Sequence, residues 1–273
     1  MVDHSIKPPR PTLGEIEGIA RQAGNILVEG FTRKKLIDMK GEIDLVTEVD
    51  REAEKFIVGE IKTKFPGQQI IAEESGEHSL GGEASWYIDP IDGTTNFAHG
   101  LPIFAVSIGY AWEGEVQLGV VYNPAQDELF SAEKGKGAWL NGRPIKTAES
   151  KELSRSLLVT GFPYDRFTNP DNNLDYFNKF ALSVRGIRRL GSAALDLCSV
   201  ACGRVDGYWE IRLEPWDIAA GVLIAREAGA RVSKLFGEEE RLLSAPCSVA
   251  AANPALHTKM IEVIQVVRQE KQV

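Results

Sequence analysis

The sequence predicts a layered sandwich, partly α+β and partly α/β, in which helix layers alternate with sheet layers. Up to about residue 150 the pattern is two helices followed by strands joined by tight turns, which favours a mainly antiparallel sheet. From residue 151 strands alternate with helices, which favours an α/β layer. No repeat or low-complexity linker separates the halves. We therefore expect segments 1–150 and 151–273 to be packed subdomains of one compact unit.

Two amphipathic helices are expected to open the first half. Thr12 and Glu15 form a capping-box pattern, and apolar residues then recur at helical spacing up to Leu27. Segment 32–44 is charged and aperiodic, which predicts a hairpin or loop. A second helix is expected over about 47–65, because proline and glycine follow directly.

The other elements are predicted from short apolar runs bounded by turn residues. In the first half we expect strands at 69–74, 85–89, 103–112, 116–123 and 128–133. In the second half we expect strands at 156–161, 186–191, 205–211 and 247–252. Helices are expected at 171–184, 192–203, 215–228 and from about 254.

Composition excludes several classes of protein. The hydrophobic fraction of 43% and the charged fraction of 26% are typical of globular chains, not disordered ones. No apolar run reaches the ~20 residues that span a bilayer, and the first residues lack the apolar core of a secretory signal. Three cysteines are too few for a disulfide framework. We expect a cytoplasmic protein that, at a net charge of −8, does not bind nucleic acid broadly.

Three groups of carboxylates are not explained by solvation on helix faces. Glu73 and Glu74 follow an apolar strand, and Asp89 and Asp92 lie in the segment WYIDPIDGTTNF. Asp217 stands just inside a helix start that is marked by proline. A bare Asp-Pro turn with a capped helix would explain the second group alone. The coincidence of all three favours a polynuclear site, and oxygen ligands without nearby Cys or His favour Mg²⁺ or Mn²⁺.

The local pattern also predicts a phosphate cradle. We expect Pro90 to end the strand ladder, because it has no N–H, and the two aspartates to point to one side of a turn. The amides of Gly93, Thr94 and Thr95 would then open a helix, whose N-terminus attracts anions. Carboxylates beside such a cradle make sense if cations lie between them and a phosphate.

At these residues the chain resembles the inositol monophosphatase family, lithium-sensitive phosphatases that need Mg²⁺ and have a sugar-phosphatase-like fold. The first shared motif, W-x-x-D-P-x-D-G-T-x-N-F-x-H-G-x-P, lies at 86–102. The second, W-D-x-A-x-G-x-L-I-x-x-E-A-G, lies at 216–229. Further similarity lies at DLVTEVD (44–50), AEES (72–75) and GSAALDL (191–197). The matches follow the family's order along nearly the whole chain.

The resemblance implies a metal-ligand set. Glu73, Asp89 and the carbonyl of Ile91 would hold one Mg²⁺, and Asp89, Asp92 and Asp217 a second. Glu73 would help to place a third, weaker ion. Mn²⁺ is an alternative metal.

The resemblance also implies the catalytic and substrate-binding residues. Thr94, paired with Asp44, would orient the attacking water beside Glu73, and the amides of Gly93 and Thr94 would grip the phosphate. The wall that meets the alcohol would be built from Gly191, Ser192, Ala193 and Glu210. Lys34 and Lys35 match the family's flexible loop, and His99 is expected to be structural and not a general acid.

The implied function is hydrolysis of a small polyol or sugar phosphate monoester, foremost myo-inositol 1-phosphate, by a homodimeric phosphoric monoester hydrolase. Fructose 1,6-bisphosphate and other sugar or nucleotide phosphates remain alternative substrates. Asp92-Gly93-Thr94-Thr95-Asn96-Phe97 departs from the D-G-T-K-E-F of relatives that act on adenosine bisphosphate, which favours a polyol phosphate. Ala230 stands where the family usually has glycine.

Two rival interpretations remain. A nucleotide-binding enzyme is disfavoured, because Gly135-Lys136-Gly137 lies in an expected hairpin turn and no phosphate-binding glycine motif is present. A regulatory binding protein on the same fold is the other. It would use Arg185, Arg188 and Arg189, which we interpret instead as a subunit interface or a structural group.

Overall fold

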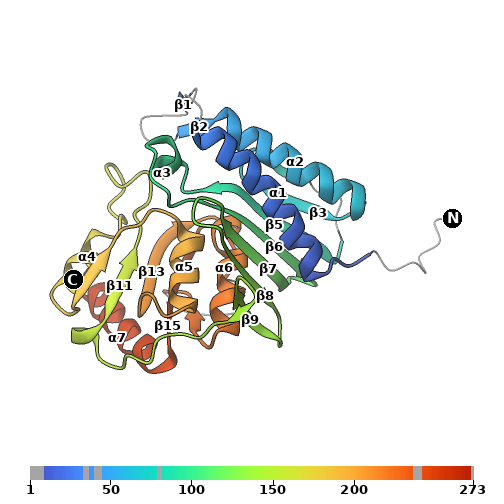
Figure 1. Cartoon of the computed structure of the whole chain (residues 1–273). Helices are drawn as coiled ribbons and strands as arrows, with labels where there is room; N and C mark the ends of the chain where they lie inside the picture. The colour runs from blue at the N-terminus through green and yellow to red at the C-terminus, as the bar shows by residue number, and fades with distance from the viewer. Residues whose placement is uncertain (1–8, 33–36, 40–44, 79–81, 236–241, 272–273) are drawn as a thin grey trace.

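The structure, a computed structural model, describes residues 9–32, 37–39, 45–78, 82–235 and 242–271. They form five layers in the order helix, sheet, helix, sheet, helix (Figure 1). Three clusters of buried apolar side chains fill the spaces between the layers. The predicted layered sandwich is confirmed. No helix in the described ranges is long and apolar enough to cross a membrane.

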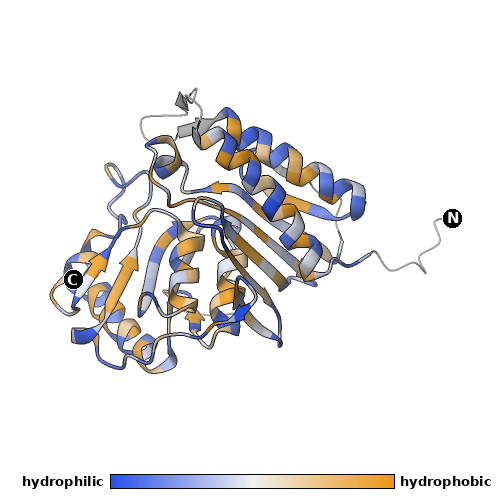
Figure 2. Cartoon of the chain, viewed as in Figure 1, coloured by the Kyte–Doolittle hydropathy of each residue, from blue (hydrophilic) through white to orange (hydrophobic). Residues whose placement is uncertain are grey.

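The first layer is a pair of helices, α1 (Leu13–Thr32) and α2 (Glu48–Lys64). The predicted capping box is present at α1, where Glu15 accepts a hydrogen bond from the Thr12 amide (2.8 Å) and donates its own amide to the Thr12 hydroxyl (3.3 Å). Figure 2 shows hydrophilic residues interspersed with hydrophobic ones along both helices. Their apolar faces pack onto the first sheet. Between them, β1 (Ile37–Met39) and β2 (Leu45–Thr47) pair antiparallel, as the predicted hairpin requires.

The first sheet has eight strands in the order β10-β9-β8-β7-β6-β5-β3-β4, and only β3 and β5 pair parallel. Its strands are β3 (Gln69–Ala72), β4 (Gly76–His78), β5 (Ala84–Asp92), β6 (Ala105–Trp112), β7 (Glu115–Asn123), β8 (Glu128–Glu133), β9 (Gly137–Leu140) and β10 (Arg143–Pro144). The turn at 134–136 joins β8 to β9, which confirms a hairpin at Gly135-Lys136-Gly137. The short helix α3 (Thr94–Ala98) follows β5.

The middle layer is α5 (Ala193–Ala201) and α6 (Pro215–Glu227), which are covered by sheets on both sides. Two glycines let α6 lie flush on the first sheet. A Cβ atom on Gly109 would stand 3.0 Å from the Ala219 Cβ, and one on Gly119 would stand 2.8 Å from the Ala220 carbonyl oxygen. Because so little space remains, the position of α6 is fixed by strands β6 and β7.

The second sheet has five strands in the order β12-β11-β13-β15-β14. They are β11 (Leu157–Thr160), β12 (Gly186–Arg188), β13 (Gly207–Leu213), β14 (Arg231–Ser233) and β15 (Cys247–Ala252). The first three in the sheet order run parallel and the last two antiparallel to their neighbours. Helices α4 (Leu174–Ala181) and α7 (Pro254–Lys271) cover its outer face, and the 3-10 turn η1 (Leu153–Arg155) precedes β11.

Candidate active site

The end of β5 carries Asp89 and Asp92, and both are almost fully buried. The expectation that Pro90 ends the ladder is wrong, because β5 continues to Asp92. Asp89 pairs with Ser107 and Asp92 with Ala105, so β5 has one more residue than β6 between these two pairs. A bulge of this kind accommodates a proline that has no N–H to donate. It also sends both carboxylates into the same cleft.

Asp92 is held by the N-terminus of α5. It accepts hydrogen bonds from the Ser192 hydroxyl (2.7 Å) and from the amides of Ala193 (3.2 Å) and Ala194 (2.6 Å). Burial raises the pKa of Asp92 to about 6, while these three donors act in the opposite direction. Ser192 and Ala193, expected as part of the substrate wall, therefore also lock a carboxylate of the first half to a helix of the second.

Glu73 and Asp217 reach the cleft from two other elements. Glu73 follows β3, and its amide donates to the Ile88 carbonyl of the parallel neighbour β5 (3.2 Å). Asp217 lies in the first turn of α6, where its carboxylate accepts the Glu214 amide (2.8 Å) in a capping box. The structure thus places Glu73, Asp89, Asp92 and Asp217 around one cleft.

These four carboxylates share an unfavourable electrostatic environment. Enclosure by protein raises the pKa of Glu73 to about 8, helped by the charges of Asp50 and Glu74, although the Glu73 side chain stays accessible at the cleft mouth. Burial first, and then the charge of Glu73, hold the pKa of Asp89 well above its usual range. Burial also raises the pKa of Asp217 well above its usual range. Among the described residues, none of the four forms an ion pair with Lys or Arg.

The donor set fits a hard divalent cation. Oδ1 of Asp89 is buried and has no hydrogen-bond partner in the described part of the chain, which is costly unless something binds it. Within the same part, no three His, Cys, Asp or Glu side chains converge on a single ion position. Mg²⁺ does not need such a cage, since it is usually bound by one or two carboxylates and completes its shell with water and substrate phosphate.

The turn between β5 and α3 supplies the neutral part of the site. Gly93 has a φ of 99°, which favours glycine, and it precedes the first residue of α3. The Thr94 hydroxyl donates to the Ile91 carbonyl (2.9 Å). The side-chain Nδ2 of Asn96 donates to the carbonyls of Ile103 (2.8 Å) and Leu190 (2.7 Å), which ties the turn to the second half.

The remaining residues that the sequence singled out have different outcomes. Asp44, Lys34 and Lys35 fall outside the described residues. His99 is exposed at the C-terminal end of α3. Of the three arginines, Arg189 lines the cleft and is the one basic side chain among the described lining residues.

Sequence reasoning missed Asp50. This side chain lies in the first turn of α2, is 1% exposed, and raises the pKa of both Glu73 and Asp89. Acidic residues in a first turn are ordinary helix-capping features, so the pattern gave no reason to place it in a site. It is a fifth carboxylate beside the cluster.

The wall from the second half is dominated by Glu210 on β13. Its carboxylate accepts the Tyr208 hydroxyl (2.8 Å), and burial raises its pKa to about 7. Gly161, Phe162 and Tyr164, which follow β11, line the same cleft and were not anticipated. Gly191, expected here, lies beside the Arg189 guanidinium.

Comparison with known proteins gives a consistent result. The sequence model of the inositol monophosphatase family matches residues 10–269. The chain is 52% identical over 213 residues to an inositol-1-monophosphatase of Synechocystis, covering 77% of this chain and 74% of that protein. It is 41% identical over 245 residues to Nus factor SuhB of Salmonella typhimurium, covering 89% and 91%. The structure of an inositol monophosphatase from Anabaena superposes with a TM-score of 0.84 at 42% identity, covering 93% and 94%.

Proposed function

The chain belongs to the inositol monophosphatase family, and from that membership we propose that it is a Mg²⁺-dependent phosphatase of small polyol or sugar phosphate monoesters, foremost myo-inositol 1-phosphate. One observation supports this most directly. Four carboxylates from three elements face one cleft, none of them forms an ion pair with a described Lys or Arg, and Oδ1 of Asp89 has no hydrogen-bond partner among the described residues. Such a cluster is suited to recruiting cations, and the cations in turn attract a phosphate.

The proposed ligands are those expected from the sequence. Glu73, Asp89 and the Ile91 carbonyl would hold one ion, and Asp89, Asp92 and Asp217 the other. Because no three such side chains converge on one position among the described residues, the three aspartates would have to draw together around their ion. Glu73 would share in a third, and Mn²⁺ is an alternative to Mg²⁺. Bound there, the metal would neutralise phosphate charge and lower the pKa of a bound water molecule, so that it could attack phosphorus as hydroxide.

The protein's own groups would place the phosphate and the water. The amides of Gly93 and Thr94, at the start of α3, would donate hydrogen bonds to a phosphate oxygen. Because the Thr94 hydroxyl donates to the Ile91 carbonyl, its oxygen can accept a hydrogen bond from the attacking water and orient it. Asp44 remains the expected partner of Thr94, and pairing with it would require the hydroxyl to turn away from Ile91. A carboxylate would take up the proton that the water loses, and Glu73 and the buried Asp50 are the candidates.

The alcohol side of the substrate would meet Glu210, Gly191 and Arg189. A carboxylate accepts hydrogen bonds from several hydroxyl groups, so this wall suits a polyol better than an aromatic alcohol. Arg189 would suit a second anionic group, which keeps fructose 1,6-bisphosphate as an alternative substrate.

The test is phosphate release from inositol 1-phosphate, fructose 1,6-bisphosphate, adenosine 3′,5′-bisphosphate and histidinol phosphate, each with Mg²⁺, with chelator and with Li⁺. We expect the highest kcat/KM on inositol 1-phosphate, loss of activity with chelator, and inhibition by Li⁺. No phosphate release from any of the four with Mg²⁺ would refute the proposal.

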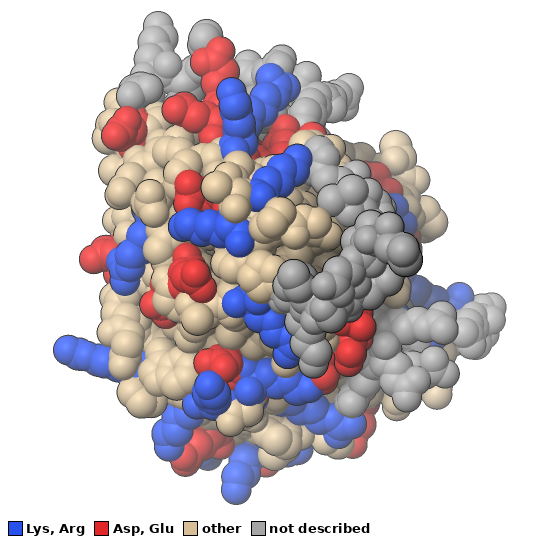
Figure 3. All heavy atoms as spheres, turned by 90° about the vertical axis from the view of Figure 1, so that its right-hand side faces the viewer, with Lys and Arg blue, Asp and Glu red and all other residues tan. Residues whose placement is uncertain are grey.

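A second candidate function is regulatory binding. It is favoured by relatives named Nus factor SuhB at 41% identity over most of both chains. Arg185 and Arg188 are exposed and available for such a role. The net charge of −8 does not favour a nucleic acid as the partner. Figure 3 shows that acidic and basic side chains are interspersed on a different face of the molecule. A partner that binds Asp89→Asn normally but not Arg188→Glu would establish a function separate from hydrolysis.

We also propose a homodimer. Phe167 and Leu182, in the second half, keep 74% and 91% of their surface exposed, as apolar side chains do at interfaces. Sedimentation velocity should show a dimer that Leu182→Asp weakens, and a monomeric wild type would contradict it.

A further inference from the structure

Gly161 lies directly against the carboxylate of Glu210. It follows the last residue of β11, which pairs parallel with β13, and Thr160 stands opposite Trp209, next to Glu210 (Figure 1). A Cβ atom built on Gly161 would overlap the Glu210 carboxylate. Both residues line the candidate active-site cleft.

The backbone does not explain the glycine. Gly161 is absent from the residues with positive φ, so an alanine could adopt the same conformation. What glycine supplies here is space. With no side chain at position 161, the Glu210 carboxylate lies back against β11 and receives the Tyr208 hydroxyl at 2.8 Å.

A buried hydrogen-bond network prevents Gly161 from moving away. The side-chain amide of Asn173, fully buried, donates to the Gly161 carbonyl (2.6 Å) and to the Thr160 hydroxyl (2.9 Å). The Trp209 indole donates to the side-chain oxygen Oδ1 of Asn173 (2.8 Å), and the Thr160 hydroxyl donates to the Trp209 backbone carbonyl (2.6 Å). The end of β11 is therefore fixed to β13, and an added methyl group must displace the carboxylate and not the backbone.

We infer that Gly161 is a specificity-determining residue, which sets how far the Glu210 carboxylate stands from the alcohol part of the substrate, and that Asn173 is the positioning residue that holds it. This inference rests on the proposed phosphatase function. A methyl group at position 161 moves the end of a flexible side chain toward the cleft, so it narrows the space for a bulky cyclic polyol. An acyclic alcohol such as glycerol needs less of that space.

The experiment compares kcat/KM for inositol 1-phosphate and glycerol 2-phosphate in wild type, Gly161→Ala, Glu210→Ala and the double variant. We expect Gly161→Ala to lower the ratio of the two values by about 10-fold, mostly through KM on inositol 1-phosphate, a size of discrimination that one methyl group can produce. In the Glu210→Ala background the same substitution should change the ratio about twofold or less, because the overlapping carboxylate is gone. The double variant also lacks the steric overlap, so it reports on folding.

Gly186→Ala is the matched control. Gly186 lies on β12 of the same sheet without positive φ, and a Cβ there would meet Leu157 at an ordinary 3.5 Å. Its ratio should equal that of wild type. An unchanged ratio in Gly161→Ala, or an equal fall in the Glu210→Ala background, would overturn this inference alone. A wild type inactive on both phosphates would remove polyol phosphates from the proposed substrates and overturn this inference with them.

Discussion

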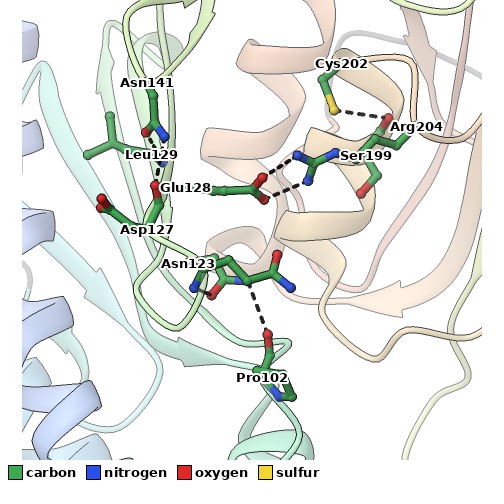
Figure 4. A network of polar contacts seen from close by, with 10 residues as sticks. Pro102, Asn123, Asp127, Glu128, Leu129, Asn141, Ser199, Cys202 and Arg204 are labelled. Atoms are coloured by element: carbon green, nitrogen blue, oxygen red, sulfur yellow. Dashed lines mark hydrogen bonds and ion pairs between the residues drawn. The ribbon is translucent and has the colours of Figure 1, made fainter.

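Carboxylates occur in two contrasting regions of this protein. The carboxylate of Glu128 on β8 accepts hydrogen bonds from Nη1 (2.7 Å) and Nη2 of Arg204, which follows α5. This ion pair links the first sheet to the middle layer (Figure 4). In the cleft, Glu73, Asp89, Asp92 and Asp217 have no such partner among the described residues. Desolvation raises the pKa values of all four, and the charges of neighbouring carboxylates add to the rise at Glu73, Asp89 and Asp217.

The difference shows what each region is built for. An ion pair that is complete within the chain contributes to stability and leaves nothing to bind. A cluster that is incomplete lowers the stability of the folded chain and keeps its affinity for an external cation. Stability and function are therefore separated in space, and carboxyl-to-amide substitutions can test this in both regions.

The largest expected effect is that of Asp89→Asn. We expect kcat to fall by about 10²–10³-fold or more, the range found when one group that supports transition-state charge is removed. In metal-free protein the same substitution should raise the free energy of unfolding, because burial and the neighbouring carboxylates make the ionised form of Asp89 costly in the folded chain, and asparagine avoids that cost. Activity and chemical denaturation with chelator measure both quantities.

Glu128→Gln is the matched control for that substitution. It makes the same chemical change where a cation is already present, so activity should stay near wild type. Equal losses of activity in the two variants would contradict the claim that the cleft carboxylates have a role in hydrolysis that Glu128 lacks.

The second effect is stabilisation by Mg²⁺. At 100 times its Kd, an ion that binds only the folded chain adds about 2.7 kcal/mol to the free energy of unfolding. Thermal unfolding with and without Mg²⁺, at matched ionic strength, measures it. Asp217→Asn should lose most of the gain, and an unchanged gain would remove Asp217 from the proposed ligands.

The third effect is pH dependence in the absence of metal. Burial raises the pKa of Glu210 to about 7. Enclosure raises the pKa of Glu73 to about 8, but the Glu73 side chain is exposed, so solvent screening makes its contribution to stability smaller. A carboxyl with a raised pKa binds a proton in the folded chain at pH values where the unfolded chain has lost it, so stability falls as pH rises from about 4.5 to 8. We expect Tm to fall by a few degrees over this range, since 1 kcal/mol corresponds to about 2–4 °C in a chain of this size. Glu210→Gln should flatten the profile, and a Tm that rises with pH would contradict the assignment.

The smallest effect is on the stability of the Glu128–Arg204 contact. Arg204 is 45% exposed at its side chain, so solvent screens the pair. Glu128→Gln should lower the free energy of unfolding by about 1 kcal/mol or less. A double-mutant cycle with Arg204→Met isolates the pair, and a coupling of zero would show that it links the layers without stabilising them.

Most of the fold could be predicted because its long elements carry local signals. Helix α1 is long enough for a helical period to appear, and a capping box marks its start. Strands β6 and β7 are long enough for their apolar runs to be recognised. The missed strands β4, β9, β10 and β14 have two to four residues each, and they are strands only because a neighbour pairs with them. The continuation of β5 past Pro90 depends on a bulge against β6, which no local pattern encodes.

The carboxylates of the site could be singled out because each stands where an apolar element begins or ends. Their partners could not be predicted. The α5 amides that hold Asp92 are about a hundred positions away in sequence. Asp50 looks like an ordinary acid of a first helical turn, and the importance of Gly161 appears only when Glu210 is seen beside it. Long-range packing decides these relationships, not residue type.

The flush contact of α6 with the first sheet has an evolutionary consequence. Gly109, Gly119 and the small residues Ala219 and Ala220 share one seam, and the same helix begins with the proposed ligand Asp217. A larger residue on either side of the seam would lift the helix and carry that carboxylate with it. Substitutions at contacting positions more than a hundred residues apart are therefore coupled, because a larger side chain on one side of the seam must be compensated by a smaller one on the other. Helices α1 and α2 lie outside this seam, so their substitutions are free of this constraint.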